Sequence, residues 1–319
     1  MARKPRIHAP GSLHHVMLRG NGGQAIFSDD ADRRRFCALL AEGVERFGHR
    51  IHAYCLMENH AHLAIRVGDA PLSRIVQNLA FRYTRAYNRR AGRVGHLFQG
   101  RFRSLLVDRD AYLLELVRYI HLNPVRAGLV SEPASWAWSG HRAYLGKDRI
   151  AWLDSEPILR MFDERDVRRA RRRYAGFVRE GLGETYREEL HRGDVDARVW
   201  GDEAFVRGIL GGSGPPAAAP RLSAIIAAVC AATGLGEPLL RANGRGRRAA
   251  RARGMVGLLA TRMRAATLSR IALHFDRDVA TISRQVGRVA MAVRRDPGLG
   301  AQVARLQRAL EVNKANTQA

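Results

Sequence analysis

Apolar and polar residues follow two different spacings along the first 126 residues, and these spacings predict short strands and amphipathic helices. The predicted strands are residues 13–19, 50–56, 60–67 and 103–107. Helical spacing of apolar side chains predicts helices over about 31–47 and 72–90, and a third helix carries Tyr119. Expected helix starts are Asp29 or Asp30, Pro71, and Asp108 or Asp110.

The order of these elements, β-α-β-β-α-β-α, predicts an α+β fold. A small antiparallel sheet of ferredoxin-like type, with helices packed on one face, is the arrangement that such an order favours.

The remainder of the chain is predicted to be helical. Residues 151–203 are rich in charge and are expected to form a solvated connector helix. A glycine- and proline-rich linker follows, and after it come an apolar helix (222–232), a basic helix (247–264) and a helix-turn-helix. The predicted domains are 1–150 (catalytic), 151–212 (connector), 213–220 (linker) and 221–312 (all-α, DNA-binding).

The net charge of +24 strengthens this division and points to a polyanionic partner. Residues 1–150 carry 24 basic and 12 acidic side chains, residues 151–203 carry 11 and 13, and residues 204–319 carry 19 and 5. Two basic blocks therefore flank a near-neutral middle, as two DNA-contacting modules with a spacer require. Almost all the basic residues are arginine, which suits DNA contacts but is also what a GC-rich genome encodes.

Cysteine content and hydropathy exclude several other classes. The three cysteines are widely spaced and form neither a disulfide framework nor a zinc knuckle. No apolar stretch follows the basic N-terminus, and no run is long enough for a membrane span. The expected location is the bacterial cytoplasm, in association with the nucleoid, without a membrane partner.

Two short segments carry the candidate chemistry. His60 and His62 lie two positions apart on a predicted strand, so both project from one face and suit a divalent ion, Mg²⁺ or Mn²⁺. Tyr119 and Asn123 lie four positions apart, at the end of a helix that Pro124 is expected to terminate.

Each of these residues also has an ordinary structural interpretation. A helical tyrosine is often an amphipathic core residue, and Asn123 is either a third metal ligand or a helix cap. Glu115 is expected to pair with Arg118 or with the helix N-terminus rather than bind metal. His14, His15, His96 and His121 are expected to be structural.

The segments Glu58–Ile65 and Arg118–Val130, in this order, resemble the HUH single-tyrosine transposases, most closely the REP-associated branch. The flanking segments His14–Asn21 and Gly95–Phe102 agree with it, so the resemblance covers roughly residues 8–146. It implies that Tyr119 attacks single-stranded hairpin DNA and forms a 5′-phosphotyrosine, that His60, His62 and Asn123 bind the metal, and that the protein acts as a monomer or homodimer. The DNA-contacting residues expected from the shared motifs are Arg19, Asn21, Arg101 and Arg103.

Residues from about 221 to 297 resemble the DNA-binding domain of the bacterial replication initiator DnaA. The resemblance rests on the basic helix that ends near Thr261 and on the pattern Leu268–Phe275 followed by Thr281. It departs in the turn, which lacks the histidine that the initiator places before its threonine. Outward residues expected to contact duplex DNA are Ser283, Arg284, Gln285 and Arg288, with phosphate contacts from Arg247, Arg251 and the rest of the Arg247–Arg253 cluster.

Three functions are compatible with these patterns. The favoured one is a metal-dependent DNA strand transferase that nicks and rejoins hairpin-forming single strands and also recognises duplex DNA. A domesticated transposase that only binds DNA would not need to keep His60, His62, Tyr119 and Asn123 together. A plasmid-type replication initiator or relaxase usually has a larger catalytic domain than this spacing allows.

Overall fold

The fold comes from a computed structural model, which describes residues 9–107, 109–183, 199–200, 220–242, 246–263 and 265–315. The chain divides into two compact units, one formed by residues 1–109 and 115–201 and the other by residues 202–319 with residues 110–114. The expected linker (213–220), apart from its last residue, and part of the expected connector (151–212) lie outside the described residues. Among the described helices, none has the length and hydrophobicity that crossing a bilayer requires.

The first unit is built on a sheet with the strand order β2-β3-β1-β4-β5. Its strands are β1 (Leu13–Arg19), β2 (Arg50–Leu56), β3 (His60–Arg66), β4 (Arg103–Val107) and β5 (Val199–Trp200). The first four strands pair antiparallel, in the order of a ferredoxin-like sheet, which confirms the expected fold class. The short β5 pairs parallel to β4 and was not predicted.

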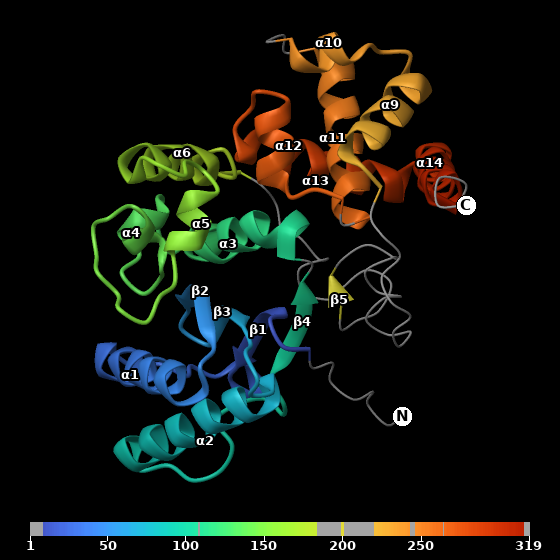
Figure 1. The fold of residues 1–319 in the computed structure, drawn as a ribbon. Helices are drawn as coiled ribbons and strands as arrows, with labels where there is room; N and C mark the ends of the chain where they lie inside the picture. The colour runs from blue at the N-terminus through green and yellow to red at the C-terminus, as the bar shows by residue number, and fades with distance from the viewer. Residues whose placement is uncertain are drawn as a thin grey trace. The chain divides into compact units, whose positions relative to one another are not determined.

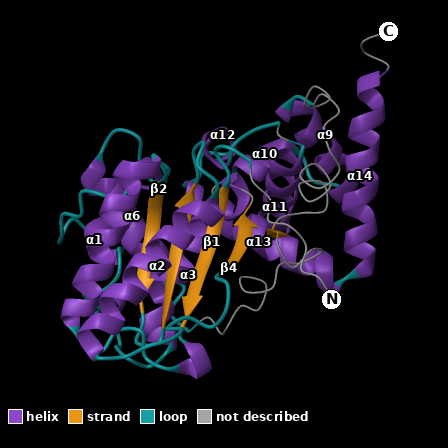
Figure 2. Cartoon of the chain, turned by 90° about the horizontal axis from the view of Figure 1, so that it is seen from below, coloured by secondary structure: helices purple, strands orange, loops and turns teal. Residues whose placement is uncertain are grey.

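Helices cover both faces of this sheet (Figures 1 and 2). Helices α1 (Asp30–Phe47) and α2 (Leu72–Ala91) lie on one face, while α3 (Arg109–Arg126) lies on the other (Figure 1). Consecutive residues of β1 and β3 are therefore buried, whichever face they point to. The expectation of helices on one face holds for α1 and α2 but is wrong for α3.

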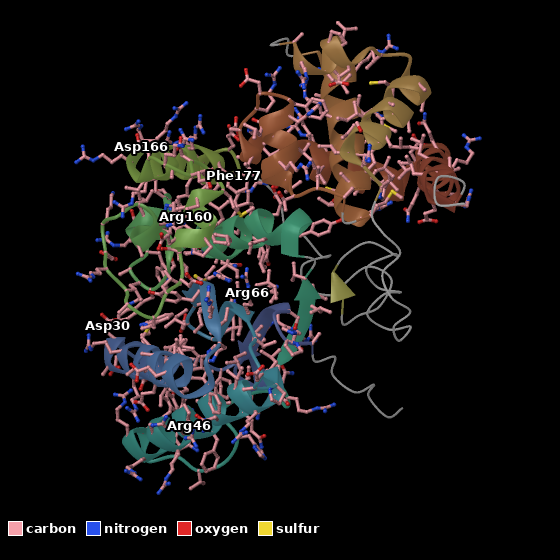
Figure 3. All side chains as sticks on the ribbon, viewed as in Figure 1. Asp30, Arg46, Arg66, Arg160, Asp166 and Phe177 are labelled. Carbon is pink, nitrogen blue, oxygen red and sulfur yellow. The ribbon has the colours of Figure 1, made fainter. Side chains whose placement is uncertain are left out.

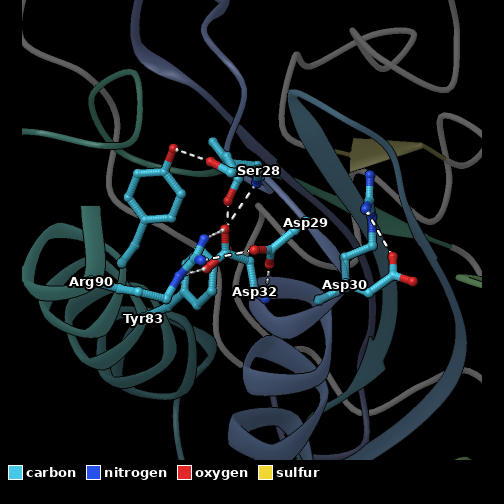
Figure 4. A network of polar contacts seen from close by, with 9 residues as sticks. Ser28, Asp29, Asp30, Asp32, Tyr83 and Arg90 are labelled. Carbon is cyan, nitrogen blue, oxygen red and sulfur yellow. Dashed lines mark hydrogen bonds and ion pairs between the residues drawn. The ribbon is translucent and has the colours of Figure 1, made fainter.

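A polar cluster joins the start of α1 to the end of α2 (Figure 4). Asp29 caps α1 by accepting a hydrogen bond from the backbone N–H of Asp32. The Arg90 guanidinium donates to both carboxylate oxygens of Asp32, at 3.0 and 2.6 Å, and to Asp29 at 2.8 Å. Because Asp32 is buried, this bidentate pair supplies the charge compensation that a buried carboxylate needs.

The region after α3 packs into the same unit. It contains the 3₁₀ turn η2 (Pro133–Ser135) and the helices α4 (His141–Tyr144), α5 (Glu156–Arg160) and α6 (Val167–Arg179). A second 3₁₀ turn, η1 (Asn21–Gly23), lies between β1 and α1. Asp166 caps α6, and Phe177 lies near the other end of the helix (Figure 3). Tyr174, Phe177 and Val178 are buried, so α6 is not the solvated connector helix that its charge predicts.

Tyr174 fastens α6 to α3 and α4. Its hydroxyl lies 2.7 Å from Nδ1 of His121 and 2.7 Å from Nδ1 of His141. Burial lowers the pKa of His121 well below its usual value and that of His141 to about 4, so both rings are neutral near pH 7. One hydroxyl has a single proton to donate, so one imidazole accepts from Tyr174 and the other donates to it.

The second unit is helical in its described residues, as predicted. Its helices are α9 (Leu222–Thr233), α10 (Glu237–Arg241), α11 (Arg247–Arg262), α12 (Leu268–His274), α13 (Val279–Arg295) and α14 (Pro297–Ala315). Two glycines bring α11 close to α13: a Cβ atom at Gly254 would lie 2.5 Å from the carbonyl oxygen of Gln285, and one at Gly257 would lie 2.3 Å from Val286 Cγ2.

Candidate active site

Three sequence motifs that are distant along the chain meet at one end of the sheet. The backbone N–H of Gly20 donates to the carbonyl of Asn59 at 2.8 Å, and that of Asn21 donates to Leu97 at 2.9 Å. The backbone N–H of Gln99 donates to the carbonyl of Arg19 at 2.8 Å. A side chain at Gly20 would collide with the carbonyl oxygen of Gln24, which explains why this turn requires glycine.

His60 and His62 lie on the same face of β3, as their spacing predicts. Nδ1 of His60 is 2.7 Å from Oδ1 of Asn59. An amide oxygen only accepts, so His60 donates from Nδ1 and carries its lone pair on Nε2. The amide nitrogen of Asn59 donates in turn to the carbonyl of Gly23 at 3.2 Å. The Asn59 side chain therefore fixes the tautomer of His60 and ties it to the Gly20 turn.

His62 contacts a third histidine, His15 on the neighbouring strand β1. Nε2 of His15 lies 2.9 Å from Nδ1 of His62, and the two rings stack with their centroids 5.1 Å apart. Both side chains are buried. The sequence interpretation of His15 as merely structural misses this contact. Antiparallel pairing of β1 with β3 places His15 opposite Ala64, and Ala64 is the next residue after His62 on the same face of β3. This register cannot be read from the sequence.

Tyr119 lies over this histidine cluster, on α3. Its ring makes edge contacts with His62 and His15, with centroids 6.0 and 5.9 Å apart, while the centroids of His60 and His62 are 5.0 Å apart. The Arg126 guanidinium carbon lies 4.3 Å from the centroid of the Tyr119 ring, and Nη1 of Arg126 donates to the Tyr119 carbonyl at 2.8 Å. A phenol, two imidazoles that share one strand face and a guanidinium are thus gathered at one place.

Asn123 and Pro124 explain an unexpected continuation of this helix. Pro124 was expected to terminate it, but α3 runs on to Arg126. Proline has no N–H for the carbonyl of Ile120, one turn earlier, and the amide nitrogen of Asn123 donates to that carbonyl at 3.3 Å and to that of Tyr119 at 3.1 Å.

A glycine ends α3 after this point. Gly128 has a positive φ of 69°, and the N–H of Leu129 donates to the carbonyl of Pro124 at 2.9 Å, which is a Schellman arrangement. Asn123 is thus not the helix cap that was one of its two interpretations. Its amide nitrogen is used within the helix, so Oδ1 is the atom that can serve as a ligand.

Glu115 lies one turn before Tyr119 and forms an ion pair with Arg118, as expected. The two side chains are 2.7 Å apart and both are buried. The guanidinium of Arg118 also lies 4.6 Å from the centroid of the Phe177 ring. Glu115 is thus engaged in an ion pair beside the site.

The donor set around Tyr119 fits a divalent cation. His60 presents Nε2 in the tautomer that a metal ligand needs, and His62 shares its strand face. With the amide oxygen of Asn123, the set would be two nitrogens and one oxygen, which suits Mn²⁺ and leaves positions for phosphate oxygens and water. Among the residues that the structure describes, no three histidine, cysteine, aspartate or glutamate side chains are grouped to bind one ion.

The four residues expected to contact DNA in this unit are all exposed. Arg19 is paired in register with His60, and Arg103 with Met17 of β1. Asn21 begins η1, and Arg101 precedes β4. Arg19 therefore lies at the His60 end of the site. Arg103 lies on β4, which pairs with β1 on the side opposite β3.

In the second unit, the residues expected to contact DNA differ in their exposure to solvent. Arg247, Arg251 and Arg288 are exposed, and Arg284 is half-buried. Ser283 is fully buried, so the expectation that it points outward is wrong. Ser283 shares its burial with Ile282 and Val286, which lie on the α13 face packed against α11.

Arg253 and Gln285 also depart from the expectation. Arg253 is buried, where its Nη1 donates to the carbonyl of Leu240 at 2.8 Å and its Nε donates to Oε1 of Gln285 at 3.2 Å. Burial, together with nearby Arg277, lowers the pKa of Arg253. The pair therefore holds α10, α11 and α13 together, and Arg253 is not part of an exposed phosphate-binding cluster.

Residues 11–123 match the family described as transposase IS200 like, which supports a DNA-cleaving transposase domain in this part of the chain. A solved structure of a REP-associated tyrosine transposase bound to a REP hairpin is similar at 19% identity and a TM-score of 0.40, over 49% of this chain and 93% of that one. No curated protein matches the chain.

Proposed function

We propose that the first unit cuts and rejoins single-stranded DNA through a covalent bond to Tyr119. The observation that carries this proposal is the contact of the Tyr119 ring with His62, beside His60, in the part of the chain that matches the IS200-like transposases. These residues come from a strand and a helix that lie far apart in the sequence.

In the proposed reaction, the phenolate oxygen of Tyr119 attacks a backbone phosphorus. The new bond joins the tyrosine oxygen to the 5′ phosphate, the bond from phosphorus to the 3′ oxygen breaks, and that oxygen takes up a proton. Attack of a 3′ hydroxyl on the phosphotyrosine reverses the step. One phosphodiester is exchanged for another, so rejoining requires no external energy source.

The residues around Tyr119 have distinct proposed roles. His60, His62 and Asn123 would hold a divalent cation, Mg²⁺ or Mn²⁺, which supplies positive charge for the phosphate oxygens and for the phenolate. Arg126 lies over the ring of Tyr119 and is bonded to its carbonyl, so it restrains the nucleophile and adds a fixed positive charge. Arg19, Asn21, Arg101 and Arg103 are proposed to bind the phosphates or bases of the strand.

The first test is formation of the covalent adduct. Full-length protein with Mn²⁺ and a 3′-labelled single strand that forms a hairpin, taken from the flanks of the gene, should give a labelled protein band that survives denaturing electrophoresis. The cut should also release a fragment that ends in a 3′ hydroxyl, which a template-independent polymerase can extend. Binding of the hairpin without an adduct, with Mn²⁺ present, would instead favour the DNA-binding regulator.

We propose that the second unit adds recognition of duplex DNA. The supporting observation is that Arg247 and Arg251 are exposed in the first two turns of α11, while Arg288 is exposed on α13. Helix α13 follows α12 after a four-residue turn, and Asp278 caps it by accepting from the N–H of Thr281 at 2.7 Å. The arginines of α11 are proposed to contact phosphates, and Arg284 and Arg288 are proposed to read base edges.

Removing two phosphate contacts should weaken binding to all duplex sequences together. The double variant Arg247→Ala/Arg251→Ala is expected to reduce the slope of log affinity against log salt by about two, since each phosphate contact contributes roughly 0.9. Fluorescence anisotropy over a salt series measures the slope. Arg305→Ala/Arg308→Ala removes the same charge from exposed positions of α14 and serves as the matched control.

An equal effect of both pairs would mean that only net charge matters and would contradict a defined contact by α11. The single variant Arg284→Ala separates the second proposed role, since it should lower discrimination between sequences by about 1–3 kcal/mol at one base pair.

A further inference from the structure

His15 lies on a different strand from the proposed metal ligands and has no role in the proposed reaction, yet it makes a close polar contact with one of these ligands. Its Nε2 lies 2.9 Å from Nδ1 of His62, and both side chains are buried. The ring of His15 also contacts Tyr119, with centroids 5.9 Å apart and planes at 72°. One side chain therefore touches both the proposed nucleophile and one of the proposed ligands.

Only one proton can lie between two neutral imidazole nitrogens in hydrogen-bond contact. If His15 donates from Nε2, Nδ1 of His62 accepts, and Nε2 of His62 carries the other proton and cannot bind a metal. If His62 donates from Nδ1, its lone pair lies on Nε2, as it does in His60, where the Asn59 oxygen fixes the same tautomer. Two ligands on one face can act together only in the second case.

We infer that His15 is a positioning residue that accepts the Nδ1 proton of His62, and so sets the tautomer and ring orientation of His62 for metal binding. The inference rests on the proposed function of this site. In this arrangement His15 is itself protonated at Nδ1, and its Nε2 is the acceptor. Histidine ligands generally have such an acceptor on their other nitrogen, and losing it lowers metal affinity about 10–100-fold.

The tautomer can be read directly from the full-length protein without metal or DNA. In a long-range ¹H–¹⁵N spectrum recorded where the ring is neutral, His62 should show a protonated Nδ1 and an unprotonated Nε2, with its signals identified by their loss in His62→Gln. The opposite pattern in the wild-type protein would overturn the inference, whatever the activity of the protein.

Three variants separate positioning from packing. His15→Phe keeps a ring beside Tyr119 but removes the acceptor, and we expect Mn²⁺ affinity, followed by the EPR signal of free Mn²⁺, to fall about 10–100-fold. His15→Gln restores an acceptor oxygen and should recover most of the affinity and the wild-type tautomer of His62. His14→Gln changes the adjacent buried histidine on the other face of β1 and should alter neither.

The outcomes distinguish this inference from the proposed function. A wild-type protein with the expected tautomer and Mn²⁺ binding but no covalent adduct would overturn the proposed reaction and leave the role of His15 intact. If the wild-type protein forms the adduct and folded His15→Phe has unchanged Mn²⁺ affinity, the role of His15 is overturned and the proposed reaction stands. If His15→Phe fails to fold, the wild-type spectrum and the pair His15→Gln and His14→Gln still decide the question.

Discussion

Tyr119→Phe should abolish the covalent protein–DNA adduct and the nick, because phenylalanine keeps the ring against His62 and His15 but has no oxygen to attack phosphorus. Folding should change little, since the substitution removes one hydroxyl and keeps the packing, a difference of about 1 kcal/mol. The adduct is measured by denaturing electrophoresis, and hairpin affinity is measured by anisotropy, where we expect no more than a few-fold change.

Tyr112→Phe is the matched control for this variant. Tyr112 is also a buried tyrosine on α3, two turns before Tyr119, so the substitution removes the same group from the same helix. It should leave the adduct intact. An adduct that persists in Tyr119→Phe and disappears in Tyr112→Phe would transfer the role of nucleophile to Tyr112 and refute our assignment.

Chelation of divalent ions should stop cleavage almost completely while the protein remains folded, and His60→Ala should have a similar effect. His60 is proposed to supply one of three protein ligands, so its loss weakens metal binding without touching the Tyr119 ring. Excess Mn²⁺ should partly restore the adduct in His60→Ala, because mass action offsets a lower affinity. The measurement is the adduct yield over a Mn²⁺ series, with EDTA as the zero point.

His96→Ala provides the comparison for the histidine variant. His96 is exposed and belongs to the segment that bonds to the Gly20 turn, where its carbonyl accepts from the Gln24 side chain at 3.5 Å. Alanine keeps that carbonyl, so adduct yield and Mn²⁺ dependence should equal those of the wild type. Full cleavage by wild-type protein in EDTA would refute the metal role of His60, His62 and Asn123 together.

Local patterns predict the strands and helices of the first unit well because each depends on spacing within a short window. The predicted strand over residues 13–19 matches β1, and 103–107 matches β4. The two-residue β5 has no such signal, since its identity as a strand depends on parallel pairing with β4. The placement of α3 on the second face is likewise a tertiary result that no periodicity encodes.

The site shows the same division between local and tertiary information. The spacing of His60 and His62 places both side chains on one face of β3. The spacing of Tyr119 and Asn123 places both on one side of α3. Which side chain completes the cluster depends on the register of β1 with β3, so His15 could not be recognised from its own neighbourhood. In the second unit, helical spacing does not determine which face of α13 is buried. The close approach of α11 at Gly254 and Gly257 determines it, and Ser283 is buried as a result.

The proline in α3 has a consequence for the side chain that precedes it. With an ordinary residue at position 124, the carbonyl of Ile120 would receive a backbone N–H and the amide of Asn123 could turn among several rotamers. Pro124 leaves that carbonyl to Asn123, and an unsatisfied buried carbonyl costs about 1–3 kcal/mol, so one rotamer is selected. The side chain of Asn123 is therefore ordered when the helix folds. The entropic cost of ordering it then does not reduce the free energy of binding an ion or DNA.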